Sequence, residues 1–139
     1  MKILIVSQYY LPEQFQINEI APELVKRGHE VTVLCGMPNY PKGVVFDGYE
    51  SKEGIESKER EYLEQTGVKV VHCDQIPRGH NPLQLFMNYF SFVRNSKKIV
   101  RTLSKDFDVV LGYQLSPITS MYAALEYKKL TGVPVVYYT

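Results

Sequence analysis

The chain has 139 residues, 45% of them hydrophobic and 22% charged, with a formal net charge of +1. This length and composition indicate one globular domain that can bury a core, and the balanced charge argues against a nucleic-acid partner. The two cysteines, Cys35 and Cys73, are too few for a disulfide scaffold and lack zinc-site spacing, which favours reduced thiols in a cytoplasmic protein.

Five short apolar runs rich in β-branched residues predict strands buried on both faces of a sheet, at 2–7, 30–35, 68–73, 107–111 and 133–138. Helical periodicity predicts helices from residue 15 to Gly28, over 83–104 and from 117 to 130. Strands that alternate with helices form parallel sheets covered on both faces. The predicted fold class is therefore α/β, a Rossmann-like doubly wound parallel sheet of five strands within a single domain, 1–139.

The segment 49–66 differs from its surroundings because it is dense in Glu and Lys and poor in apolar residues. Such a segment is usually solvated. We therefore expect a charged surface excursion within the domain, with a short helix near 57–65.

The segment 83–104 has the longest helical pattern. Its polar residues recur at spacings of three and four and form one stripe: Gln84, Asn88, Ser91, Asn95, Lys98 and Thr102. Most of the remaining surface is apolar up to residue 93 and basic after it. Two interpretations stay open for 83–101: burial in the core and against a partner domain, or contact with a membrane surface.

Sheets of this kind bind ligands outside the carboxyl ends of their strands, where the strand order reverses. The chain contains no GxGxxG, GxxxxGK[ST] or GxSxG motif, which argues against a dinucleotide site, a P-loop and a nucleophile elbow. No His, Cys or Asp cluster has metal-ligand spacing, so no metal is expected.

The loops at that edge are QYYLPEQF, GMPNYPKG, QIPRGHNP and GYQLSP. Aromatic rings pack on the C–H faces of sugars, and amides and hydroxyls hydrogen-bond sugar hydroxyls. Arg78 is suited to a phosphate group. These loops are compatible with a saccharide ligand, although Pro, Gly and Asn are common in surface loops generally.

The segments KILIVSQYYLPE, GHEV, GMPNYPKG, IPRG, NYFSFV and YQLSPIT follow one another in that order. Together they resemble retaining GT-B glycosyltransferases of family 4, in the branch that builds O-antigen, capsule and colanic-acid-type polysaccharides. The resemblance runs from residue 1 to about residue 138. It implies the N-terminal, acceptor-side domain of a two-domain enzyme, with the C-terminal donor-binding domain absent from this chain.

The resemblance also implies the chemistry. A hexosyltransferase of this type would move a sugar from a UDP- or GDP-linked donor to a lipid-linked saccharide with retention, and it needs no other cofactor. It would act in the cytoplasm or at the inner face of the cytoplasmic membrane, and residues 1–139 alone would be inactive. The alternative is a stand-alone, non-catalytic α/β module that binds a ligand or a partner.

The resemblance assigns acceptor or cleft contacts but no catalytic residue. The assigned residues are Tyr9, Tyr10, Asn18, Pro38, Asn39, Tyr40, Gly43, Arg78, Tyr113, Gln114 and Ser116. Competing structural roles stay open, since the tyrosines would also cover the sheet edge and Ser116 would also cap a helix. Glu13–Phe15 replace a glycine pair of many relatives, and Gln16 stands where a basic residue is common.

Overall fold

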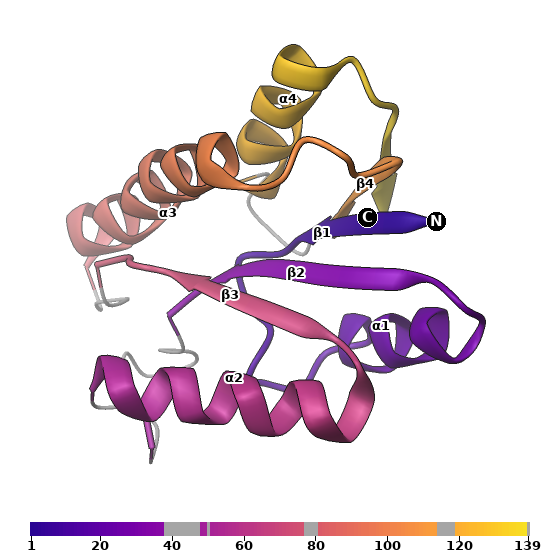
Figure 1. The fold of residues 1–139 in the computed structure, drawn as a ribbon. Coiled ribbons are helices and arrows are strands. Elements are labelled where there is room, and N and C mark those ends of the chain that lie inside the picture. Colours follow the sequence, from indigo (N-terminus) through magenta and orange to yellow (C-terminus); the bar gives the residue numbers. More distant parts are fainter. Residues whose placement is uncertain (38–47, 50, 77–80, 114–118, 139) are drawn as a thin grey trace.

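The computed structural model describes residues 1–37, 48–49, 51–76, 81–113 and 119–138. Five strands form one parallel sheet in the order β3-β2-β1-β4-β5. Their bounds are β1 Lys2–Val6, β2 Glu30–Gly36, β3 Lys69–Cys73, β4 Val109–Tyr113 and β5 Val135–Tyr138. Helices α1 (Ile17–Lys26) and α2 (Lys52–Thr66) cover one face, and α3 (Pro82–Thr102) and α4 (Ser120–Thr131) cover the other (Figure 1). The predicted Rossmann-like fold is confirmed.

The central strand β1 is apolar throughout because both of its faces are covered. Leu4, Ile5 and Val6 are fully buried, and β1 pairs in parallel with β2 and with β4. Side chains that alternate along a strand point to opposite faces, so Ile5 joins the core under α1 and Leu4 the core under α4. From β1 the chain proceeds outward to β3 and then crosses back to β4, so the strand order reverses between β1 and β4.

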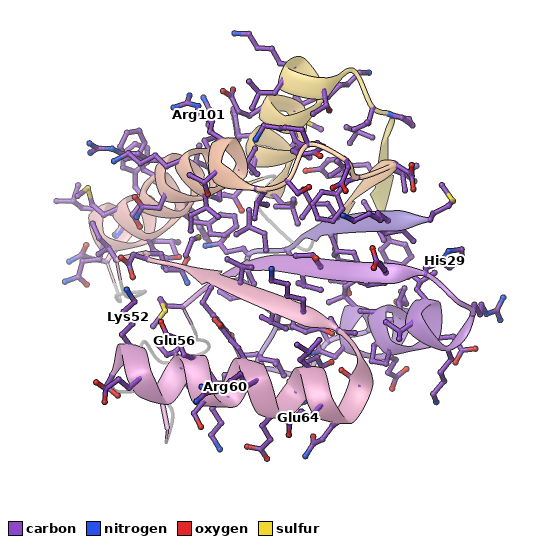
Figure 2. All side chains as sticks on the ribbon, in the orientation of Figure 1. His29, Lys52, Glu56, Arg60, Glu64 and Arg101 are labelled. Atoms are coloured by element: carbon purple, nitrogen blue, oxygen red, sulfur yellow. The ribbon has the colours of Figure 1, made fainter. Side chains whose placement is uncertain are left out.

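Most of the charged segment 49–66 forms the crossover helix α2, Lys52–Thr66, which is longer than the expected helix near 57–65 and lies at the surface with none of its residues fully buried. Its N-cap, Ser51, accepts a hydrogen bond from the Gly54 N–H at 3.0 Å. The half-buried Tyr62 packs on the core beneath, whereas Arg60 and Glu64 are exposed on the outer side (Figure 2). The low proportion of apolar residues concealed the full length of this helix in the sequence, because few of its residues face the sheet.

Helix α3 turns the middle of its polar stripe inward, beside the fully buried Phe92 and Val100, whereas Gln84, Lys98 and Thr102 of the stripe stay exposed. Asn88 is fully buried and Ser91 nearly so, while Leu83, Phe86 and Phe90 are exposed by 70%, 61% and 53%. These three side chains therefore lie outside the core of this domain, and contact with a partner domain or with a membrane surface stays open for them. None of the helices in the described residues is long and apolar enough to cross a membrane.

The inward stripe has a physical cause. The chain after β3 leaves main-chain groups of Asp74 and Ile76 that no strand pairs. Asn88 Nδ2 donates to the Ile76 carbonyl at 2.7 Å, and Ser91 Oγ accepts from the Ile76 N–H at 2.7 Å. Further along, Asn95 Nδ2 donates to the Asp74 carbonyl at 2.7 Å. The polar residues of α3 thus complete the end of β3.

Two glycines at helix ends allow a controlled test of packing. Gly67 after α2 and Gly132 after α4 have almost the same left-handed backbone, with φ of 78° and 79°. A Cβ at Gly67 would lie 2.7 Å from Val25 Cγ1, whereas nothing lies within 4 Å of a Cβ at Gly132. The Val25 side chain is stiff because it is β-branched and lies in a helix.

We predict that Gly132→Ala lowers the free energy of unfolding by about 1–2 kcal/mol, the cost of a left-handed non-glycine residue. Gly67→Ala should lose this amount and roughly 1–3 kcal/mol more from overpacking. Urea unfolding of both variants measures the difference. Equal losses would show that the contact with Val25 relaxes freely.

Candidate functional site

The point where the strand order reverses is the natural place for a ligand, and the chain after β1 is anchored there. The Ser7 N–H donates to the Leu34 carbonyl at 3.0 Å, and the Gly36 N–H donates to the Gln8 carbonyl at 2.9 Å. These bonds continue the β1–β2 pairing beyond β1. The loop that follows is therefore held at the carboxyl edge of the sheet.

Aromatic rings and an amide form a wall beside this point. Tyr113, the last residue of β4, stacks on Tyr138 of β5 with ring centroids 5.3 Å apart and an interplanar angle of 20°. The Tyr138 hydroxyl donates to Gln16 Oε1, which joins β5 to the residue before α1. Tyr113 is buried, but Tyr138 is 38% exposed and Gln16 is exposed. We call Gln16, Tyr113 and Tyr138 the switch-point wall.

The structure places the other described site candidates differently. Tyr10 is fully buried, and its hydroxyl lies 2.6 Å from that of Tyr62 on α2. Burial raises the pKa of Tyr10, as does the bond to Tyr62. The ring therefore faces the core and not a cleft, which corrects our expectation. Tyr9 is also buried, with its ring centroid 6.1 Å from that of Phe15.

Asn18 shapes the loop from within. Its Nδ2 donates to the Tyr10 carbonyl at 2.9 Å, and its Oδ1 accepts from the Phe15 N–H at 2.8 Å. Both amide atoms of Asn18 therefore have main-chain partners across the turn into α1. The remaining candidates lie outside the described residues and stay predictions: Pro38, Asn39, Tyr40, Gly43, Arg78, Gln114 and Ser116.

A buried carboxamide network lies behind the edge. Gln8 Nε2 donates to Asn88 Oδ1 at 3.2 Å and to Gln75 Oε1 at 3.3 Å, and Thr119 Oγ1 donates to Gln8 Oε1 at 2.6 Å. All four side chains are nearly or fully buried. The sequence analysis did not select any of them, although Asn88 was part of the polar stripe of an otherwise apolar helix.

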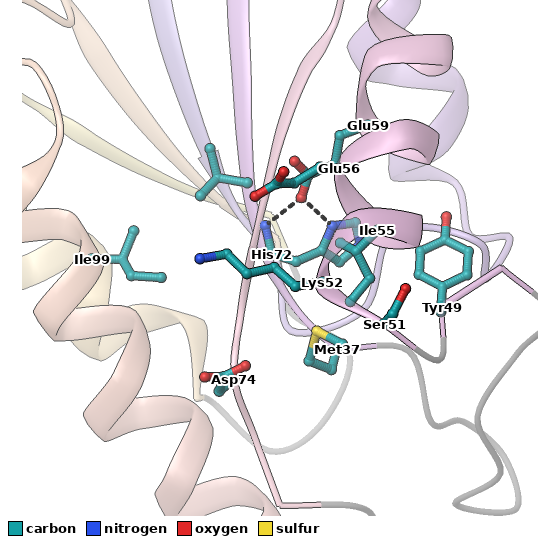
Figure 3. Close-up of a pocket in the computed structure, with 11 residues that line it drawn as sticks. Met37, Tyr49, Ser51, Lys52, Ile55, Glu56, Glu59, His72, Asp74 and Ile99 are labelled. Atoms are coloured by element: carbon teal, nitrogen blue, oxygen red, sulfur yellow. Dashed lines mark hydrogen bonds and ion pairs between the residues drawn. The ribbon is translucent and has the colours of Figure 1, made fainter.

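A hollow of about 620 Å³ opens between α2 and the edge strand β3 (Figure 3). Met37 and Asp74, which follow β2 and β3, place it at the same carboxyl edge. The other residues that line it include Tyr49, Lys52, Glu56, Glu59, His72 and Ile99. The lining combines acidic and basic side chains with the Tyr49 ring, which suits a polar uncharged ligand better than a highly charged one.

The polar centre of this hollow is a partly buried ion pair. The His72 side chain is 2% exposed, and its Nδ1 lies 2.8 Å from Glu59 Oε1 and its Nε2 3.2 Å from the Leu11 carbonyl. Both acceptors require a proton on the facing nitrogen, so the ring is an imidazolium. Burial by itself lowers the pKa of His72, but Cys35, Glu59 and the Leu11 carbonyl outweigh it and raise the pKa to about 10.

This pair links three segments: α2, β3 and the loop after β1. The Tyr49 ring, 5.7 Å from the imidazole, covers it from before α2. Sequence analysis did not identify the pair, because Glu59 and His72 lie on separate elements. Among the described residues, no group of three or more His, Cys, Asp and Glu is placed to hold a metal ion.

A family model for a glycosyl transferase 4-like domain matches residues 14–138. None of the curated proteins compared with the chain matches it. A solved structure of the C-terminal domain of a hydrogenase from Pyrococcus furiosus superposes with a TM-score of 0.62 at 24% identity, over 99% of this chain and 91% of that chain.

Two further solved structures superpose on the chain. TcCGT1 in complex with UDP gives a TM-score of 0.59 at 10% identity, over 99% of this chain and 28% of that chain. The zinc-inhibited form of teicoplanin deacetylase Orf2 gives a TM-score of 0.53 at 15% identity, over 97% of this chain and 66% of that chain. At these identities the superpositions support the fold alone.

The His72–Glu59 pair predicts a specific dependence of stability on pH. A histidine whose pKa in the folded state exceeds its ordinary value of 6.5 contributes its full stabilisation of the fold at pH values below 6.5. The contribution is lost as pH rises toward 10. Glu59→Gln should therefore lower the free energy of unfolding by about 1–3 kcal/mol near pH 6, with a smaller difference at pH 10.

The control is Glu64→Gln, the same change on the exposed side of α2. It should leave the free energy of unfolding nearly unchanged at every pH. Urea unfolding between pH 6 and pH 10 measures both variants. A constant difference between Glu59→Gln and the unmodified chain would mean that His72 is not charged.

Proposed function

The chain belongs to the glycosyl transferase 4-like family, and from this membership we propose that it forms the acceptor-side domain of a glycosyltransferase. Membership supports a general role in glycosyl transfer, and the match to residues 14–138 is the observation that carries the proposal. In the proposed reaction a hexosyl group passes from a UDP- or GDP-linked sugar to a saccharide with retention. The donor binds a second domain.

The switch-point wall supports a saccharide ligand at the carboxyl edge. Tyr138 offers an exposed aromatic face at a place where sheets of this kind bind ligands. Aromatic faces pack on the C–H surfaces of sugars, and the Gln16 amide nitrogen can donate to a hydroxyl while its oxygen holds Tyr138. Tyr138 belongs to a strand of the sheet and stacks on Tyr113, and its hydroxyl holds the Gln16 amide, so the wall is preorganised.

The contribution of this domain to catalysis would be positioning. An acceptor hydroxyl held beside the anomeric carbon of the donor reacts without the entropic cost of a bimolecular encounter. Charge that develops on the departing diphosphate would be stabilised from the donor domain. A domain that supplies one wall of the cleft would not turn over a nucleotide sugar alone.

The exposed side of α3 supports a lipid-linked acceptor at a membrane surface. Phe86 stacks on Phe90 with centroids 6.0 Å apart, and both rings are more than half exposed. Basic residues follow at helical spacing: Arg94, Lys97 and Arg101. Apolar rings followed by cations suit a bilayer interface with anionic lipids, such as the inner face of the cytoplasmic membrane during cell-surface polysaccharide synthesis. We call this exposed side of 83–101, with Phe86, Phe90, Arg94, Lys97 and Arg101, the α3 stripe; it is distinct from the polar stripe of the same helix.

The transfer reaction is tested by the release of nucleoside diphosphate from a panel of UDP- and GDP-sugars. Residues 1–139 alone should show no turnover, and a protein that joins them to a donor-binding domain should show it. In that protein Tyr138→Ala should lower kcat/KM about tenfold through the lost aromatic contact. Tyr122→Ala, which removes a more exposed tyrosine from α4, is the control.

Turnover by residues 1–139 alone would contradict an acceptor-side domain. An inactive two-domain protein would favour the non-catalytic binding module. Equal losses in Tyr138→Ala and Tyr122→Ala would remove the switch-point wall from the proposal.

The membrane contact is tested by flotation with vesicles of phosphatidylcholine and phosphatidylglycerol at low salt. The double change of Phe86 and Phe90 to Ser should reduce the bound fraction at least tenfold, because each ring would bury apolar area worth roughly 1.5 kcal/mol or more. Changing Tyr122 and Leu125 of α4 to Ser removes similarly exposed apolar groups and should have little effect. If the unmodified chain does not float, the membrane contact is wrong.

A further inference from the structure

The buried network around Gln8 connects the chain after four different strands. Gln8 itself follows β1, Gln75 follows β3, and Thr119 lies directly before α4, at the far end of the connection from β4. Gln75 Nε2 donates to the carbonyl of Met37, the first residue after β2, at 2.6 Å. A single carboxamide therefore contacts, directly or through one neighbour, every connection at the carboxyl edge between β1 and α4.

The direction of each hydrogen bond in this network is determined by main-chain carbonyls, which can only accept. The Met37 carbonyl requires the Gln75 nitrogen, so the Gln75 oxygen faces Gln8. The Ile76 carbonyl likewise requires the Asn88 nitrogen, so the Asn88 oxygen also faces Gln8. Two acceptors thus converge on one side of the Gln8 side chain.

The glutamine side chain at position 8 matches these two acceptors. Its NH2 group supplies one hydrogen to each of the two oxygens, and its own oxygen is left to accept from Thr119 Oγ1. A carboxylate at this position would face two oxygens without a proton to offer, and an apolar side chain would leave three buried polar groups unpaired.

Gly36 provides the space for this arrangement. A Cβ at Gly36 would lie 2.7 Å from Gln75 Cδ and Oε1, so only glycine lets the Gln75 amide cross the end of β2 to reach Met37. The Gly36 N–H also donates to the Gln8 carbonyl at 2.9 Å. The main chain and the side chain of Gln8 therefore act on the same point of β2.

We propose that Gln8 is a positioning residue, which couples the chain after β1 to Met37, Ile76 and Thr119 and so holds these described ends of the neighbouring connections at the carboxyl edge without contacting the ligand. In the sequence, Pro38 and Asn39 follow Met37 directly, and Gln114 and Ser116 precede Thr119. The identity of the ligand rests on the proposed function. The coupling between the connections does not.

The test is amide hydrogen exchange, followed by mass spectrometry, on Gln8→Leu. Exchange should rise at least tenfold in peptides that contain Met37, Ile76 and Thr119. Exchange in peptides at the opposite end of the sheet, such as 29–33, should change less than twofold. Gln14→Leu is the matched control, because Gln14 is an exposed glutamine in the same connection.

Gln8→Glu adds a readout of the same network that depends on pH. Burial against two oxygens raises the pKa of the new carboxyl above that of an unfolded chain, so its folded form is favoured at low pH. After correction for intrinsic rates, exchange near Met37 and Thr119 should therefore be faster at pH 8 than at pH 5. Gln14→Glu should show no such dependence.

If Gln8→Leu does not fold, Thr119→Val removes a single hydrogen bond with little change of shape. It should raise exchange at Ile76, which the described hydrogen bonds connect to Thr119 through Gln8 and then through Asn88 or Gln75. The proposal is overturned if exchange rises uniformly along the chain, or if Thr119→Val acts only on its own peptide. If the coupling is found but the two-domain protein turns over no nucleotide sugar, the proposed function fails and the role of Gln8 stands.

Discussion

Buried polar groups at the carboxyl edge of the sheet must be hydrogen-bonded, and much of this structure follows from that requirement. The chain that leaves β3 carries main-chain groups that no further strand pairs. Helix α3 satisfies them with Asn88, Ser91 and Asn95 and therefore turns its polar side toward the sheet. Phe92 and Val100 of the same helix enter the core, while Phe86 and Phe90 are exposed and stack on each other. The α3 stripe is thus a consequence of how the sheet edge is completed.

The same requirement protects the free edge of β3. A parallel edge strand presents unpaired donors and acceptors that invite association. Here the His72 N–H donates to Glu59 Oε1 of α2 at 3.3 Å, and the Asp74 carbonyl accepts from Asn95 of α3. Glu59 also pairs with the His72 imidazolium, so one carboxylate serves the main chain and the side chain together. The charged sequence of α2 therefore has a structural purpose on its inner side.

The two surfaces proposed for function lie on opposite faces of the sheet but depend on one frame. The switch-point wall combines β4, β5 and the residue before α1 on the α1 side, and the α3 stripe faces outward on the other side. Between them, Gln8 ties the ends of the strands to α3 and to the start of α4. A saccharide at the edge and a lipid surface at α3 would therefore contact parts of the same rigid body.

The alternation of apolar runs determined the five strands, the doubly wound order and the carboxyl edge, because strand burial and right-handed crossovers depend on local pattern and chirality. The sequence did not reveal that α2 is a full crossover helix, that the middle of the polar stripe of α3 faces inward, or that Tyr10 belongs to the core. Nor did it reveal the links from Gln8 to Thr119 and from His72 to Glu59, whose residues lie 111 and 13 positions apart. Only tertiary structure decided these features, since a buried polar side chain finds its partner through the packing of separate elements and not through any local spacing.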